Sequence, residues 1–143
     1  MREGIGLYRG KREDNGEWVA SDCILQFEEY PIKKCRSVQL WVDKEGWVFV
    51  IPESVGEYIG NTDKNSIKIF EGDIGRYKQT DGAKWEGKPI ICTGKVVYNA
   101  KTASFAIDSI DEIGAKNYDY FPIKDFEIIG NVLDNPELLE QNR

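Results

Sequence analysis

The sequence contains no histidine in its 143 residues. This absence excludes catalysis by Ser-His-Asp or Cys-His systems and by histidine general bases, and it removes the commonest zinc ligand. The glycine-rich phosphate loops GxGxxG and GxxxxGK with a following Ser or Thr are missing as well. We therefore expect a protein that is not an enzyme and that has no catalytic residues, cofactor or bound metal.

Cysteine is scarce and scattered along the chain. Cys23, Cys35 and Cys92 are odd in number, and no two have the CxxC spacing of a zinc or redox pair. Such isolated thiols are typical of a reducing compartment. No apolar run approaches the roughly 18 residues that span a bilayer, and residues 1–4 do not resemble a signal peptide. These features predict a cytoplasmic protein that has no membrane partner.

The negative charge is concentrated in the last quarter of the sequence. The net charge is −6. Residues 1–107 contain 16 acidic and 16 basic side chains, whereas residues 108–143 contain nine acidic and three basic ones. An acidic C-terminal region repels nucleic-acid phosphates, so it serves solubility or meets a basic partner. We favour solubility.

Apolar residues alternate with a period of two more often than with a helical period, which predicts a mainly β fold. Residues 18–27 read as a strand, and residues 37–42 and 47–51 flank the turn Asp43-Lys44-Glu45-Gly46. This pattern predicts a hairpin in which Gly46 takes a positive φ angle. The N-terminal region is therefore expected to be a small antiparallel sheet.

A turn-rich seam near residues 56–65 suggests a subdivision of the single unit 1–143. The N-terminal β-region would cover residues 1–55, and residues 66–143 would form a second part with a short helix at its end. The strands expected in the second part are 67–70, 73–78, 90–98, 104–107, 121–123 and 126–132. Their spacing predicts a strongly bent SH3-like sheet or an open barrel, and residues 79–88 read as a loop.

Two helical segments are expected. Residues 52–58 make a poor strand and are compatible with a single helical turn. The clearer helix start lies at Asn135, which is expected to act as N-cap, with Pro136 at the first helical position and Glu137 at the positive helix end. Leu138 and Leu139 would then pack this short helix on the body.

The segment Glu71-Gly72-Asp73-Ile74 is the most pointed local motif. Gly72 fits a backbone conformation closed to other residues, and Asp73 is placed to accept hydrogen bonds from turn amides. Arg76 could pair with an acid on a neighbouring strand. A metal-assisted carboxylate site at Glu71 and Asp73, or at Asp108 and Asp111, is the alternative. We favour a structural role for these residues.

Two basic clusters lie close to aromatic or turn residues. The first is formed by Tyr8, Arg9, Lys11 and Arg12, and the second by Lys33, Lys34 and Arg36. Either could contact a nucleic-acid backbone. Both also lie among acidic residues, so ordinary surface charge is the favoured interpretation.

Several segments, in order along the chain, resemble the YopX family of phages and prophages. They are Tyr8-Arg9-Gly10-Lys11-Arg12 with Gly16-Glu17-Trp18-Val19, residues 55–65 leading into Ile69-Phe70-Glu71-Gly72-Asp73-Ile74, Ile128-Ile129-Gly130-Asn131-Val132, and Asn135-Pro136-Glu137-Leu138-Leu139. One departure is Ser66, where the family more often has glycine. The resemblance implies a β-rich fold, self-association, a bacterial host and no established activity, and it supplies no catalytic residues.

Three functions follow from these observations. The favoured one is a phage or prophage accessory protein that acts by binding or self-association, as a homo-oligomer or with a phage or host protein partner. The second is a nucleic-acid-binding small β-barrel. The third is a carboxylate- or metal-dependent enzyme, which is the least favoured.

Overall fold

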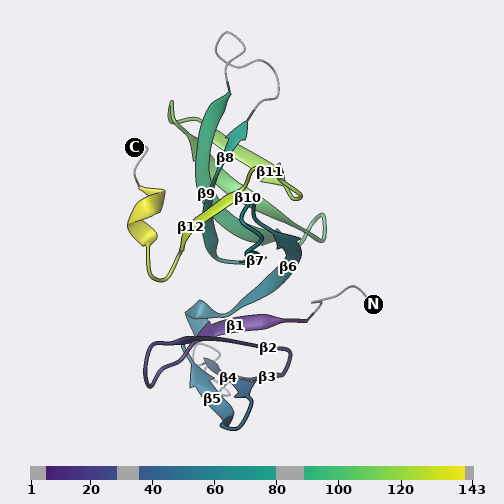
Figure 1. Cartoon of the computed structure of the whole chain (residues 1–143), viewed down its shortest axis with the longest axis vertical. Coiled ribbons are helices and arrows are strands. Elements are labelled where there is room, and N and C mark those ends of the chain that lie inside the picture. Colours follow the sequence, from purple (N-terminus) through teal and green to yellow (C-terminus); the bar gives the residue numbers. More distant parts are fainter. Residues whose placement is uncertain (1–5, 29–35, 80–88, 141–143) are drawn as a thin grey trace. The chain divides into compact units, whose positions relative to one another are not determined.

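The structure is a computed structural model that describes residues 6–28, 36–79 and 89–140. The chain divides into two compact units, Met1–Tyr58 and Ile59–Arg143. Both are built of antiparallel strands, which confirms the prediction of a mainly β fold (Figure 1). The predicted loop lies outside the described residues apart from Gln79, as do residues 1–4, Lys33, Lys34 and Cys35.

The first unit contains two small antiparallel sheets. Its strands are β1 (Tyr8–Lys11), β2 (Trp18–Ser21), β3 (Ile24–Glu28), β4 (Arg36–Val42), β5 (Gly46–Val50) and the start of β6 (Gly56–Thr62). One sheet has the order β3-β4-β5, and in the other β1 lies between β2 and β6. A bridge between Arg12 and Val50 links the end of β1 to β5. The small antiparallel sheet expected for this region is thus confirmed.

The β4–β5 hairpin forms as its turn residues require. Gly46 has a φ angle of 85°, a value that strains residues with a Cβ atom. The hairpin then pairs Val38 with Val50 and Leu40 with Val48. Val38, Leu40 and Val50 are the buried core of this unit, and Val19 and Ile24 are among the half-buried side chains that pack on it.

One expectation for this region was wrong, and another was right only in part. Residues 18–27 do not form one strand, because the backbone bends between β2 and β3, where Ser21 Oγ accepts a hydrogen bond from the Cys23 amide at 3.0 Å. β2 then pairs with β1, and β3 pairs with β4. The helical turn covers only Pro52–Ser54, and β6 follows it as a strand. Pairing with neighbouring strands outweighs the poor strand propensity of Gly and Asn in β6.

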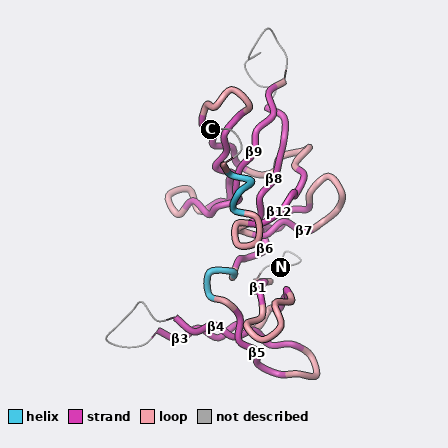
Figure 2. The backbone as a smooth tube through the Cα atoms, turned by 90° about the vertical axis from the view of Figure 1, so that its left-hand side faces the viewer, coloured by secondary structure: helices cyan, strands magenta, loops and turns pink. Residues whose placement is uncertain are grey.

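The second unit is dominated by one five-stranded sheet. The strands of this unit that follow β6 are β7 (Lys68–Phe70), β8 (Asp73–Gln79), β9 (Ile90–Asn99), β10 (Ser104–Asp111), β11 (Lys116–Tyr120) and β12 (Glu127–Asn131). The order is β11-β10-β9-β8-β12, and β7 instead neighbours β6. Within the described ranges the five-stranded sheet stays open and does not close into a barrel. Figure 2 shows its strands β8 and β9 side by side.

One predicted strand is absent from this sheet, and another was missed. Residues 121–123 are not a strand, since Pro122 has no amide hydrogen to donate to a ladder. β11 was missed because its half-buried positions are the polar residues Asn117 and Asp119, whereas its aromatic residues, Tyr118 and Tyr120, are exposed. It forms as a hairpin with β10, in which Ile107 lies opposite Asp119.

The core of the second unit collects side chains from most of its strands: Ile59, Ile69, Tyr77, Cys92, Val96, Ile107 and Phe126. Phe126 precedes β12 and is completely buried. Its ring lies directly against Gly75 of β8, where any larger residue would overlap it. Gly75 also lies opposite Gly94 on β9, where a Cβ atom would overlap Asp108 and Ser109 of β10.

The chain's last described element is a single 3-10 turn, Pro136–Leu139, with Pro136 at its start as predicted. Asn135 occupies the predicted N-cap position, but its side chain does not accept a hydrogen bond from the turn's amides, so that part of the prediction was wrong. Asn135 Oδ1 instead accepts the amide hydrogen of Asn131 at 3.2 Å, so it closes the loop after β12. Leu138 packs beside Gly130, as expected for a segment that docks on the body.

Candidate binding surface

The outer face of the β3-β4-β5 sheet carries large apolar side chains that remain in solvent. They are Leu25, Phe27, Trp41, Trp47 and Phe49, whose exposed fractions lie between 36% and 55%. We call these five residues the aromatic face. Successive residues of a strand point to opposite faces, so Leu40, next to Trp41, is completely buried on the inner face.

The strand register brings the aromatic side chains together in pairs. Trp41 lies opposite Trp47 across the hairpin, and the two rings meet edge to face with centroids 5.5 Å apart. Gln39 lies between Leu25 of β3 and Phe49 of β5. Exposed patches of this kind mark interaction surfaces in soluble proteins.

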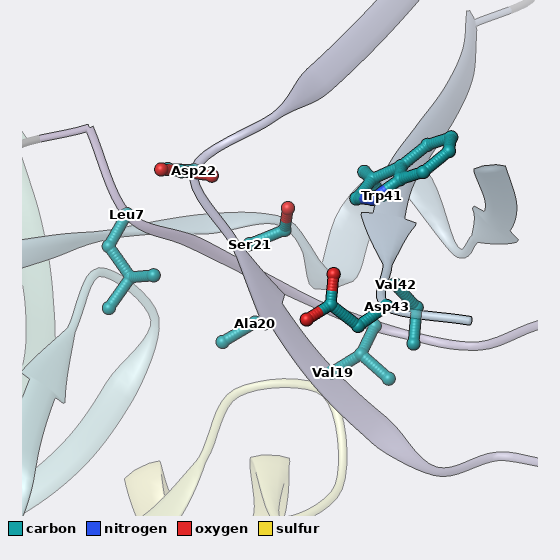
Figure 3. A pocket seen from close by; sticks show the side chains of 8 residues that line it. All are labelled: Leu7, Val19, Ala20, Ser21, Asp22, Trp41, Val42 and Asp43. Atoms are coloured by element: carbon teal, nitrogen blue, oxygen red, sulfur yellow. The ribbon is translucent and has the colours of Figure 1, made fainter. Parts of the chain in front are cut away.

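A groove of about 580 Å³ adjoins the aromatic face at Trp41 (Figure 3). We call it the acidic groove, and its lining residues are Leu7, Val19, Ala20, Ser21, Asp22, Trp41, Val42 and Asp43. The groove forms where β3 and β4 separate. The contact between these strands ends with a 3.1 Å hydrogen bond from the Trp41 amide to the Cys23 carbonyl. Beyond it, β2 pairs with β1 while β4 continues into its own turn.

Among the described residues that line the acidic groove, the charged side chains are the carboxylates of Asp22 and Asp43. Asp22 accepts a weak hydrogen bond from the Cys23 thiol at 3.5 Å, and this bond raises the pKa of that thiol. Asp43 makes no hydrogen bond or ion pair with any residue that the structure describes. Figure 3 shows its carboxylate directed across the groove towards β2. The groove therefore combines uncompensated negative charge with an indole ring.

A second, smaller groove of about 410 Å³ lies along β5, beside Trp47 and Phe49 of the aromatic face. Its lining residues are Glu13, Asp14, Trp47, Val48 and Phe49. Asp14 is paired with Arg12, whose Nη2 atom lies 2.8 Å from Asp14 Oδ2. This hydrogen bond lowers the pKa of Asp14. Acidic side chains thus flank the aromatic face on two sides.

The first predicted basic cluster lies on and just after β1, and the guanidinium groups of Arg9 and Arg12 are engaged within the chain. Arg12 is 8% exposed, and its guanidinium binds Asp14 and Glu45, with Nη1 2.9 Å from Glu45 Oε2. Arg9 lies over the Trp18 ring at 4.9 Å. The Lys11 amide donates to Ser54 Oγ at 2.8 Å, and Tyr8 packs on the core of the first unit. Intramolecular contacts thus involve each member of the cluster.

The Glu71-Gly72-Asp73 motif forms the turn between β7 and β8. Asp73 is 2% exposed and accepts the Phe70 amide hydrogen at 2.8 Å. Gly72 has a φ angle of 92°, which only glycine adopts without strain. Glu71 is half-buried, and Arg76 lies opposite Glu127 of β12 in the ladder. Gly72 and Asp73 thus stabilise the turn between β7 and β8.

The alternative acidic pair is also divided between two environments. Asp108 is exposed, whereas Asp111 is 1% exposed and accepts amide hydrogens from Ile113 and Ala115. Among the residues described, no three Cys, Asp or Glu side chains are grouped so that they could hold a metal ion. No helix in the described ranges is long and apolar enough to cross a membrane.

The family of the chain follows from comparison with known proteins. The model of the YopX protein family matches residues 7–140, which is nearly the whole chain and includes both units. The chain belongs to the YopX family. No curated protein sequence matches this YopX chain. The resemblance seen in the sequence is therefore confirmed, and the aromatic face lies within the matched residues.

Proposed function

We propose that this YopX protein acts by binding another protein chain, not by catalysis, and that the aromatic face is its binding surface. The observation that carries the proposal is the exposure of five large apolar side chains on one face of one sheet. The protein would serve as a phage or prophage accessory protein in the cytoplasm of a bacterial host.

The size of the aromatic face supports this function. An aromatic side chain has about 150–250 Å² of surface to bury, and the four rings are each between 41% and 55% exposed. They therefore offer roughly 400 Å² of apolar area, about half of what one partner contributes to a standard interface. Tryptophan and phenylalanine are also enriched at the centre of such interfaces.

Self-association is the second candidate, and the same area favours it. Two aromatic faces packed together would bury roughly 800 Å² of ring surface, and sheets do pack face to face in this way. Rim residues would bring the total towards the roughly 1,000 Å² that a biological interface exceeds. The occupant would then be a second copy of this chain.

Nucleic-acid binding and metal-assisted catalysis have less support. A nucleic-acid site needs cations that are available to phosphates, and the Arg12 guanidinium is engaged by two carboxylates. Metal-assisted chemistry at Asp73 needs an accessible carboxylate. The Asp73 side chain is buried and accepts a hydrogen bond from the Phe70 amide. The contacts of these residues therefore support both functions less well than the aromatic face supports protein binding.

Site-specific photocrosslinking tests the proposed function. The photoreactive amino acid p-benzoylphenylalanine replaces Phe49 on the aromatic face, and in a matched control it replaces Ile113, an exposed apolar residue in a turn of the second unit. We expect position 49 to give a defined crosslinked protein in the producing cells, and Phe27→Thr in the same chain to weaken it. No crosslink, or the same products from both positions, would overturn the proposal. A product that contains only this chain would identify self-association.

A further inference from the structure

The partner's chemistry can be inferred from the acidic groove, and this inference rests on the proposed function. The groove adjoins the aromatic face through Trp41, which belongs to both. Asp22 and Asp43 supply two negative charges to its lining, and no lysine or arginine is among the described residues that line it. A partner that covers Trp41 therefore also meets these carboxylates.

We propose that the acidic groove receives a lysine or arginine side chain from an extended, otherwise apolar segment of another protein. The Trp41 ring offers its face to the cation, and the carboxylates of Asp22 and Asp43 neutralise the charge. The apolar residues on either side of the cation pack on Trp47 and Phe49 of the aromatic face.

The groove's walls favour an extended segment. β2 is an edge strand of its sheet, and the contact between β3 and β4 ends at Trp41. Edge strands present backbone groups that can pair with an added strand. A volume of about 580 Å³ is that of a small-ligand site, so the groove can hold a few side chains of the segment and not a folded domain.

The charge around the aromatic face disfavours a second copy as the occupant. Asp22 and Asp43 lie at one side, and Glu13 lines the groove at the other. An isologous dimer presents the same patch from both copies, so face-to-face packing would bring acidic rims together. Like charges brought together at an interface lower affinity, whereas a basic segment relieves the same charge.

Binding of three labelled peptides tests the inference. The probes are fluorescent acetyl-Val-Lys-Val-Lys-Val-amide, its counterpart with glutamate in place of lysine, and a neutral counterpart with threonine, each titrated with the full chain by fluorescence polarisation. We expect the lysine peptide to bind at least about fivefold more tightly than the threonine peptide, and the glutamate peptide to bind most weakly. The preference should shrink as salt is raised, because exposed charges are screened.

The Asp22→Asn, Asp43→Asn double variant assigns that preference to the groove. Both side chains are exposed, so the chain should fold, which circular dichroism verifies. The matched control removes one exposed carboxylate elsewhere, with Asp108→Asn. We expect the double variant to bind the lysine peptide about fivefold more weakly and the threonine peptide unchanged, with the control like wild type.

The outcomes separate this inference from the function on which it rests. Equal affinity for the lysine and threonine peptides, or a double variant that behaves like Asp108→Asn, overturns the inference. The proposed function survives that result if position 49 still crosslinks to a protein. A crosslinked product made only of this chain overturns the inference in favour of a second copy, and failure of crosslinking overturns both.

Discussion

The phenol of Tyr77 donates a hydrogen bond to the carboxylate of Asp119, 42 residues further along the chain. It also lies 2.9 Å from the hydroxyl of Ser109, so one side chain of β8 connects β10 and β11. Burial raises the pKa of Tyr77, and the bond to Asp119 raises it further. The phenol therefore stays protonated at neutral pH, where it serves as a donor within the core and not as a base or nucleophile.

The first prediction concerns this bond. Tyr77→Phe removes the hydroxyl and leaves Asp119 with the Gln79 amide as its remaining side-chain partner. We expect the free energy of unfolding to fall by about 1–3 kcal/mol, because an acceptor loses its donor in a partly buried site. Urea denaturation measures the change. Tyr118→Phe, at an exposed position on β11, should change it by less than about 0.5 kcal/mol.

A second prediction concerns pH. Asp63 is 6% exposed, and although burial raises its pKa, hydrogen bonds from the amides of Ile128, Ile67 and Asn65 outweigh that effect and lower it. A pKa below the unfolded value means that the native state binds the proton less readily. The stability that the Asp63 carboxylate adds to the folded state is fully present above the ordinary aspartate pKa of about 3.9. This stability is lost as pH falls through the folded-state pKa of Asp63.

Asp63→Asn isolates this contribution. The amide can keep an oxygen towards Asn65 and Ile67, but its nitrogen would then face the Ile128 amide hydrogen, which Asp63 Oδ2 accepts at 3.1 Å. We expect a loss of about 1–3 kcal/mol at neutral pH and a shallower fall in stability between neutral and acidic pH. Urea titrations across that range measure both. An unchanged pH dependence would show that other carboxylates govern acid unfolding.

The third prediction tests the contact between Gly75 and Phe126. A Cβ atom at position 75 would overlap the Phe126 ring, so Gly75→Ala should destabilise the protein by about 3 kcal/mol. Phe126→Leu alone should also destabilise it, because the ring fills the core of the second unit. The double variant should lose less than the sum of the two, since the smaller side chain leaves room for the methyl group. Additive losses in a double-mutant cycle would contradict this packing.

The parts of the fold that sequence predicted are those with strong local signals. The turn at Gly46 and the apolar alternation around it give the β4–β5 hairpin, and Pro136 marks the final helical turn. β11 was missed because its tyrosines alternate with Asn117 and Asp119, whose side chains find partners only in the folded sheet. The break between β2 and β3 depends on which strands each one pairs with, and that information is not local.

The candidate binding surface was only partly accessible to sequence. Alternation correctly places Trp41 and Leu40 on opposite faces of a strand, but it does not say which face becomes the core. That choice depends on β2 and on residues as distant as Tyr8 and Val55, which pack on the inner face. The acidic groove is lined by residues from separate segments, so no motif in the sequence predicts that Asp22 and Asp43 line the same groove.

The fourth prediction tests the two faces of the β3-β4-β5 sheet directly. Leu40→Ala, on the inner face, should lower the free energy of unfolding by about 2–5 kcal/mol, since it leaves a cavity in a completely buried site. Phe49→Thr, on the outer face, should change it by less than about 0.5 kcal/mol, because that ring is 53% exposed and threonine suits a strand. Urea denaturation of both variants measures the contrast. A large loss from Phe49→Thr would mean that the ring stabilises the fold, and the aromatic face would then lose its interpretation as a surface kept for a partner.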